Sequence, residues 1–73
     1  MKIVLSRHAR RQMQWRKITL EEVEQTILHP EWVEDSIKGR KNALKNINAK
    51  LLKVTFIEEG NTITVVTAID KNQ

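Results

Sequence analysis

Pro30 divides the sequence of 73 residues into two parts with different hydrophobic periods. Before it, Leu5, Ala9 and Met13 recur at intervals of four, which is the spacing of one helical face. After it, the apolar residues tend to alternate, as is typical of strands. Because proline cannot continue a helix and restricts the residue before it, the helical part should end at His29.

Two helices are expected before Pro30. Ser6 offers a hydroxyl N-cap to a helix that begins at about Arg7. Thr19 and Glu22 have the spacing of a capping box, so a second helix should run over residues 20–28. We expect its buried face to consist of Leu20, Val23 and Ile27.

Four strands are expected after Pro30. Residues 32–37 and 41–47 predict a hairpin around Lys38-Gly39-Arg40, where the glycine can adopt a positive φ. The strand over 41–47 is weakly apolar and is expected either at an edge or covered on one face only. Residues 51–57 and 62–69 are rich in β-branched side chains and should be central. The predicted fold class is α+β, with two N-terminal helices packed on a four-stranded antiparallel sheet.

The length of the chain predicts one domain over residues 1–73 with a thin margin of stability. A partner subunit, such as a second copy in a homodimer, would add to that margin. The sequence contains no cysteine, which is consistent with a reducing compartment. We expect no signal peptide and no membrane-spanning segment, and therefore a cytoplasmic protein.

Charge is distributed in blocks of alternating sign. Residues 1–17 carry six basic residues and no acid, residues 18–36 carry six acids and no base, and residues 37–57 again carry six basic residues and no acid. The two basic blocks, if they meet in space, form the kind of surface that binds a phosphate backbone. The alternative is that each block is a solvated face of an ordinary element.

Several classes of chemistry are disfavoured by the residues present. Two histidines without cysteine or suitably spaced acids predict no metal site. The serines lack the Gly-x-Ser-x-Gly context of a hydrolase nucleophile, and no glycine-rich phosphate loop is present. We therefore expect no cofactor. Metal-independent cleavage of RNA remains, because the substrate supplies its own 2′-hydroxyl nucleophile and the protein needs only an acid, a base and cations.

The candidate site residues come from the first helix and from the hairpin. His8, in the first helical turn, is suited to accept or donate a proton, and the cations expected at the phosphate are Arg11, Arg16 and Arg40. Further RNA contacts are expected from Arg7, Arg10, Lys38, Lys41 and Lys45, with Trp15 stacking on a base. The competing interpretations are a solvated surface histidine, and tryptophans at positions 15 and 32 that anchor a core or an interface.

The sequence also contains a longer pattern: Ser6-x-His8-Ala9-x-x-x-Met13-x-x-Arg16-x-Ile18-Thr19, then Pro30-Glu31-Trp32, Lys38-Gly39-Arg40 and Val65-Val66-Thr67. It resembles the domain-of-unknown-function 4258 family, itself thought to be similar to the RelE and BrnT ribonuclease toxins. The resemblance implies a two-helix, four-stranded fold and an endoribonuclease toxin that a separately encoded antitoxin neutralises. The positions matched for function are His8, Arg16 and Thr67.

Three hypotheses of function follow. The first is an RNA-cleaving toxin that uses His8 with Arg11, Arg16 and Arg40. The second is a nucleic-acid-binding or regulatory module without catalysis, which the basic blocks support equally well. The third is a protein-interaction domain whose charged faces contact a partner such as an antitoxin.

Overall fold

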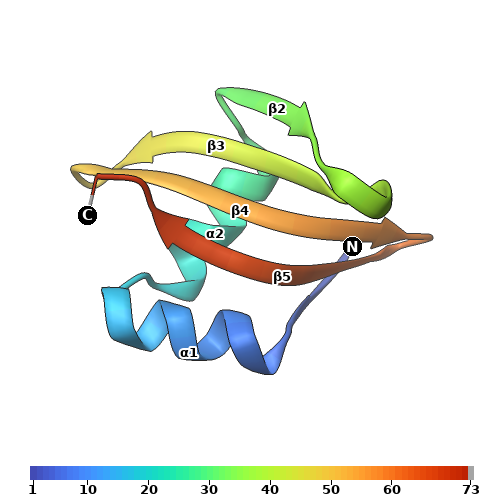
Figure 1. Ribbon diagram of the computed structural model, residues 1–73, viewed down its shortest axis with the longest axis horizontal. Helices are drawn as coiled ribbons and strands as arrows, with labels where there is room; N and C mark the ends of the chain where they lie inside the picture. Colours follow the sequence, from blue (N-terminus) through green and yellow to red (C-terminus); the bar gives the residue numbers. More distant parts are fainter. Residues whose placement is uncertain (73) are drawn as a thin grey trace.

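The computed structural model describes residues 1–72 and contains two α-helices packed on a five-stranded sheet (Figure 1). The elements, in chain order, are β1 (Lys2–Leu5), α1 (Arg7–Arg16), α2 (Leu20–Leu28), β2 (Trp32–Asp35), the short 3-10 helix η1 (Ile37–Gly39), β3 (Lys41–Ile47), β4 (Lys50–Glu59) and β5 (Thr62–Asp70). The strands lie in the order β1-β5-β4-β3-β2. The α+β class and both helices are therefore confirmed.

The expected four-stranded antiparallel sheet is wrong in one respect, because the sheet is mixed. Residues before Ser6 form β1, which pairs in parallel with β5, Ile3 opposite Ile63 and Leu5 opposite Val65. Four residues are too few to show a strand period, and the partner strand lies some sixty residues further along the chain. Only the tertiary structure identifies this segment as a strand.

The remaining strands are antiparallel neighbours, as expected. The hairpin of β2 and β3 turns at η1, where Gly39 has φ 74° and Lys38 has φ 57°. It is β2 that forms the edge of the sheet, while β3 lies inside it. In β5 the register against β4 shifts by one residue at Val66, between the pairs Phe56–Val65 and Thr55–Thr67. This bulge lies where β1 has ended and α1 begins.

Both helices cover the same face of the sheet. α1 runs beside β5 and α2 crosses behind β3 and β4 (Figure 1). The core between these layers joins Ala9 and Met13 of α1 to Val23 of α2 and to inward residues of the strands, among them Leu52, Val54, Val65 and Ala68. In β5, buried residues alternate with partly exposed ones on each side of the bulge at Val66, so one face of this strand is turned to the core. No helix within the described residues is long and apolar enough to cross a membrane.

The caps of both helices lie where the sequence predicts them. The Ser6 hydroxyl accepts a hydrogen bond from the Ala9 backbone N–H at 3.0 Å. Thr19 and Glu22 form a reciprocal capping box, and α2 ends with His29 as its C-cap. The expected buried face of α2 needs a correction, because Leu20 is 47% exposed and Glu22 is buried instead.

Glu22 is buried beside a lysine that crosses from the sheet. Lys50 Nζ lies 2.8 Å from Glu22 Oε1, and it also donates to the Lys17 carbonyl oxygen at 2.9 Å. Asn48 Nδ2 donates to Glu22 Oε2 at 2.8 Å. Burial alone would raise the pKa of Glu22, but hydrogen bonds from Lys50, the Thr19 N–H and Asn48 lower that pKa to about 2. The cluster joins the α1–α2 junction to the β3–β4 turn.

The ionisation of Glu22 should make the free energy of unfolding depend on pH in the acidic range. A carboxyl group whose pKa is lower in the folded protein stabilises it above the unfolded pKa, and that stability is lost as the pH falls through the folded pKa. The contribution of Glu22, about 1–3 kcal/mol, should therefore disappear between roughly pH 5 and pH 2. Thermal denaturation of the wild type and of Glu22→Gln across this window measures it.

We expect Glu22→Gln to be less stable than the wild type at pH 7 and the two curves to converge as the pH falls. Glu21→Gln, in the same helical turn but exposed, should follow the wild type throughout. A constant difference between wild type and Glu22→Gln from pH 7 to pH 2 would contradict this account of the cluster.

Candidate functional site

Helix α1 is fixed to the part of β5 that β1 does not cover. The Ser6 backbone N–H donates to the Val65 carbonyl oxygen at 3.0 Å, and the Ser6 hydroxyl donates to the Val66 carbonyl oxygen at 3.0 Å. Further along, the Ala68 backbone N–H donates to Gln12 Oε1 at 2.9 Å. The polar groups at this edge of β5 thus find partners at the start and in the middle of α1.

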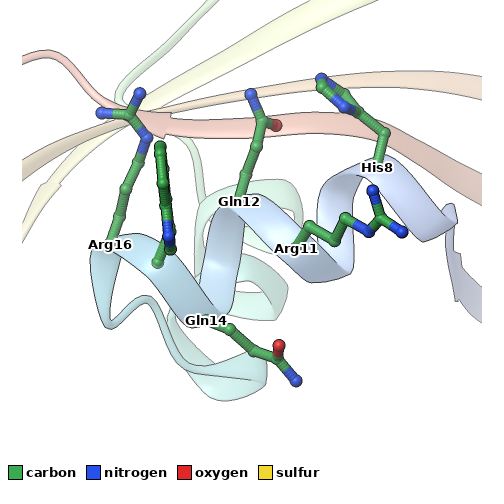
Figure 2. Close-up of a pocket in the computed structure, with 6 residues that line it drawn as sticks. His8, Arg11, Gln12, Gln14 and Arg16 are labelled. Carbon is green, nitrogen blue, oxygen red and sulfur yellow. The ribbon is translucent and has the colours of Figure 1, made fainter.

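A groove of about 430 Å³ lies on the side of α1 that does not face the core. Its lining residues all come from this helix: His8, Arg11, Gln12, Gln14, Trp15 and Arg16. Figure 2 shows that His8, Gln12 and Arg16 rise from the same side of α1, as their spacing of four requires, and that Gln14 points the other way. The volume falls in the range of small-molecule sites, about 300–1,000 Å³.

Trp15 is the most exposed large apolar residue of the described chain. It is 88% exposed, so the interpretation of Trp15 as a core anchor is wrong. Tryptophan is seldom left so exposed, since its ring buries a large apolar area when it has a partner. An indole in solvent beside two guanidinium groups is suited to stack on a base or to contact a partner protein.

Helix α1 carries a cation in its first turn, where the helix dipole does not favour one. This turn contains Arg7 and no acidic residue, although the positive end of the dipole favours acids there. Arg16, in the last turn, lies where the dipole does favour a cation. None of the six groove residues is acidic, and Arg11 and Arg16 contribute two guanidinium groups.

The structure brings together four of the residues predicted for the site. His8, Arg11, Trp15 and Arg16 line the groove, and His8 is exposed, not sealed in the interior. Arg7 and Arg10 are exposed on the same helix but do not line this groove. Arg10 instead lines a smaller hollow of about 240 Å³, which includes Met13 and Ile18.

The hairpin cations are not gathered around His8. α1 packs on β5, whereas η1 and β3 lie beyond β4, and each step between strands measures about 4.8 Å. Lys38 and Arg40 flank Gly39 in the turn, and Lys41 begins β3. The Lys45 ammonium group donates to the His29 carbonyl oxygen at 2.9 Å and so satisfies a carbonyl group at the C-terminal end of α2. The residues that line the groove with His8 include none from the hairpin, so the two basic blocks do not meet there as predicted.

Thr67, one of the positions matched for function, does not line the groove. It lies half-buried in β5, next to Ala68. Gln12 lines the groove although it was not among the predicted site residues, since one neutral glutamine among basic residues does not by itself indicate a phosphate contact. Across residues 1–72, no cluster of three or more His, Cys, Asp or Glu side chains lies close enough together to hold a metal ion.

Comparison with known proteins gives one match. The family model described as "Domain of unknown function (DUF4258)" matches residues 5–73, which is nearly the whole chain. No curated protein matches the sequence. No solved structure matches the fold.

Proposed function

The chain belongs to the family described as domain of unknown function DUF4258, and we propose that it is a toxin-like, metal-independent endoribonuclease. The observation that carries the proposal is the groove on α1, which places one exposed imidazole, two guanidinium groups and an exposed indole together, with no acidic residue among the described residues that line it. These are the groups that bind a phosphate and a base and that move a proton at neutral pH.

The proposed reaction is a transesterification within the RNA. The 2′-oxygen of one nucleotide attacks the adjacent phosphorus, and the bond from phosphorus to the 5′-oxygen of the next nucleotide breaks. His8 takes the proton of the 2′-hydroxyl, and the departing 5′-oxygen receives a proton from a water molecule. The hydroxide that remains takes the proton back from His8, so water and the neutral imidazole are both restored. The products are a 2′,3′-cyclic phosphate and a 5′-hydroxyl, and no oxidant or metal is consumed.

The cations of the groove stabilise the pentacoordinate phosphate in this scheme. Arg11 and Arg16 donate charge-assisted hydrogen bonds to its non-bridging oxygens, and Trp15 stacks on a neighbouring base. Arg40, Lys38 and Lys41, beyond β4, then contact a more distant part of the RNA chain. Two helices on one face of a sheet support the proposed likeness to RelE-type toxins, which act on RNA in the cytoplasm.

Replacement of His8 should strongly slow RNA cleavage. Purified protein is incubated with RNA in a chelating buffer, and the cyclic phosphate is detected at the 3′ end of the product. We expect His8→Ala to lower the rate by about 10²–10⁴-fold, the usual contribution of acid–base catalysis. The control is His29→Ala, the other histidine, which is exposed at the end of α2 and should cleave like the wild type.

Equal cleavage by wild type and His8→Ala would remove His8 from the mechanism. RNA binding that weakens with salt but yields no product would select the second hypothesis, a binding module without catalysis. Absence of both cleavage and binding at low salt would leave only a protein-interaction domain.

A protein partner is favoured by a separate observation, the free edge of β2. All four residues of this strand are exposed, including Trp32 and Val33, and an edge strand presents backbone groups that another strand can pair with. The carboxylates of Glu34 and Asp35 have no ion-pair or hydrogen-bond partner among the described residues, although their backbones pair with β3. We propose that an extended, basic segment of a cognate antitoxin binds along β2, where these carboxylates attract it.

Charge reversal in β2 should weaken this partner. The chain is produced with the product of a short adjacent gene, and the dissociation constant of the pair is measured by calorimetry. Glu34→Lys with Asp35→Lys should raise that constant at least about fivefold. The same reversal at Glu58 and Glu59, exposed at the β4–β5 turn, should leave it unchanged. Equal loss in both double variants would contradict docking at β2.

A further inference from the structure

The side chain of Gln12 has one polar end bound to the sheet and one end directed to the groove. Its Oε1 accepts the hydrogen bond from the Ala68 backbone N–H at 2.9 Å. A backbone N–H can only donate, so the amide oxygen must face β5 and the amide nitrogen must face away from that contact. The orientation of the amide therefore follows from its partner and not from a choice between two equivalent ends.

The amide nitrogen of Gln12 lies among the groups of the groove. Gln12 is four residues from His8 and four from Arg16, and Figure 2 shows the three side chains in a row on α1. No described residue accepts a hydrogen bond from Gln12 Nε2. The contact with Ala68 holds the side chain of Gln12, which is half-buried, in one orientation. Its NH₂ group can therefore bind a ligand with a smaller loss of side-chain entropy than a freely rotating side chain would have.

The groove is consequently rich in hydrogen-bond donors. Arg11 and the Trp15 indole can only donate, the Gln12 NH₂ group adds two more donor hydrogens, and Gln12 Oε1 already accepts one hydrogen bond from β5. A ligand that satisfies these groups must offer several acceptor oxygens close together. A phosphodiester has two non-bridging oxygens that carry the negative charge and accept from several donors at once.

We propose that Gln12 is a phosphate-binding residue, whose NH₂ group donates to a non-bridging oxygen of RNA between His8 and Arg16. This inference rests on the proposed function and adds to it a neutral donor that no charge pattern reveals. It also assigns Gln12 two separate tasks, since its oxygen fixes α1 to β5 and its nitrogen binds the ligand.

Gln12→Glu separates the two tasks. The glutamate keeps an oxygen that accepts from the Ala68 N–H, but it has no donor to offer to phosphate and adds a negative charge. Gln25→Glu is the matched control, because it adds the same charge to the neighbouring helix α2 at a residue that does not line the groove. Fluorescence anisotropy with a labelled single-stranded RNA measures affinity, and thermal denaturation reports folding.

We expect Gln12→Glu to bind RNA at least about tenfold more weakly than Gln25→Glu, with similar melting temperatures for the two variants. A second measurement needs no variant. In a ¹⁵N-labelled wild-type protein, the Gln12 side-chain NH₂ resonances should shift when RNA is added, while those of Gln25 should move less.

The outcomes separate the inference from the proposal on which it rests. If the wild type binds RNA, but the two glutamate variants lose equal affinity or the Gln12 amide does not shift, Gln12 is no phosphate ligand and the proposed function stands. If the wild type itself does not bind RNA, the proposed function and this inference are both overturned.

Discussion

The structure depends on how the long edge of β5 is completed. β1 pairs with β5 only from Thr62 to Val65, although β5 continues to Asp70. Backbone groups that are buried without a partner cost free energy, so the remaining edge needs donors and acceptors from elsewhere. Ser6 and Gln12 supply them, and α1 is thereby fixed along the strand with Ala9 and Met13 turned into the core.

This placement gives α1 two faces with different requirements. The inner face is small and apolar and packs on β5 and α2, whereas the outer face keeps its charge and its indole in solvent. The Glu22–Lys50 ion pair fixes the other end of the same helix, because Lys50 also binds the Lys17 carbonyl oxygen. Both ends of α1 are therefore tied to the sheet, and the residues that line its groove stand on a helix that is fixed at both ends.

Local signals in the sequence predicted much of the fold, and contacts distant in sequence account for the rest. The caps at Ser6 and Thr19, the stop at Pro30 and the turn at Gly39 act over a few residues and lie where they were expected. The parallel pairing of β1, the burial of Glu22 by Lys50 and the anchor of Gln12 on Ala68 each join residues at least 28 positions apart. For the candidate site, the charge pattern predicted that Arg40 lies near His8, whereas the strand order places β4 and β5 between the hairpin and α1. The residues that do lie together, such as His8, Arg11 and Arg16, are those whose spacing places them on one helix.

The central claim is that RNA binds to the outer face of α1. The most direct measurement is a titration of ¹⁵N-labelled protein with a short single-stranded RNA, followed residue by residue in heteronuclear correlation spectra. The account predicts that the largest shifts fall on the backbone of α1, on the Trp15 indole N–H and on the Ala68 N–H. Shifts confined to the β2–β3 hairpin, or no shifts at low salt, would contradict it.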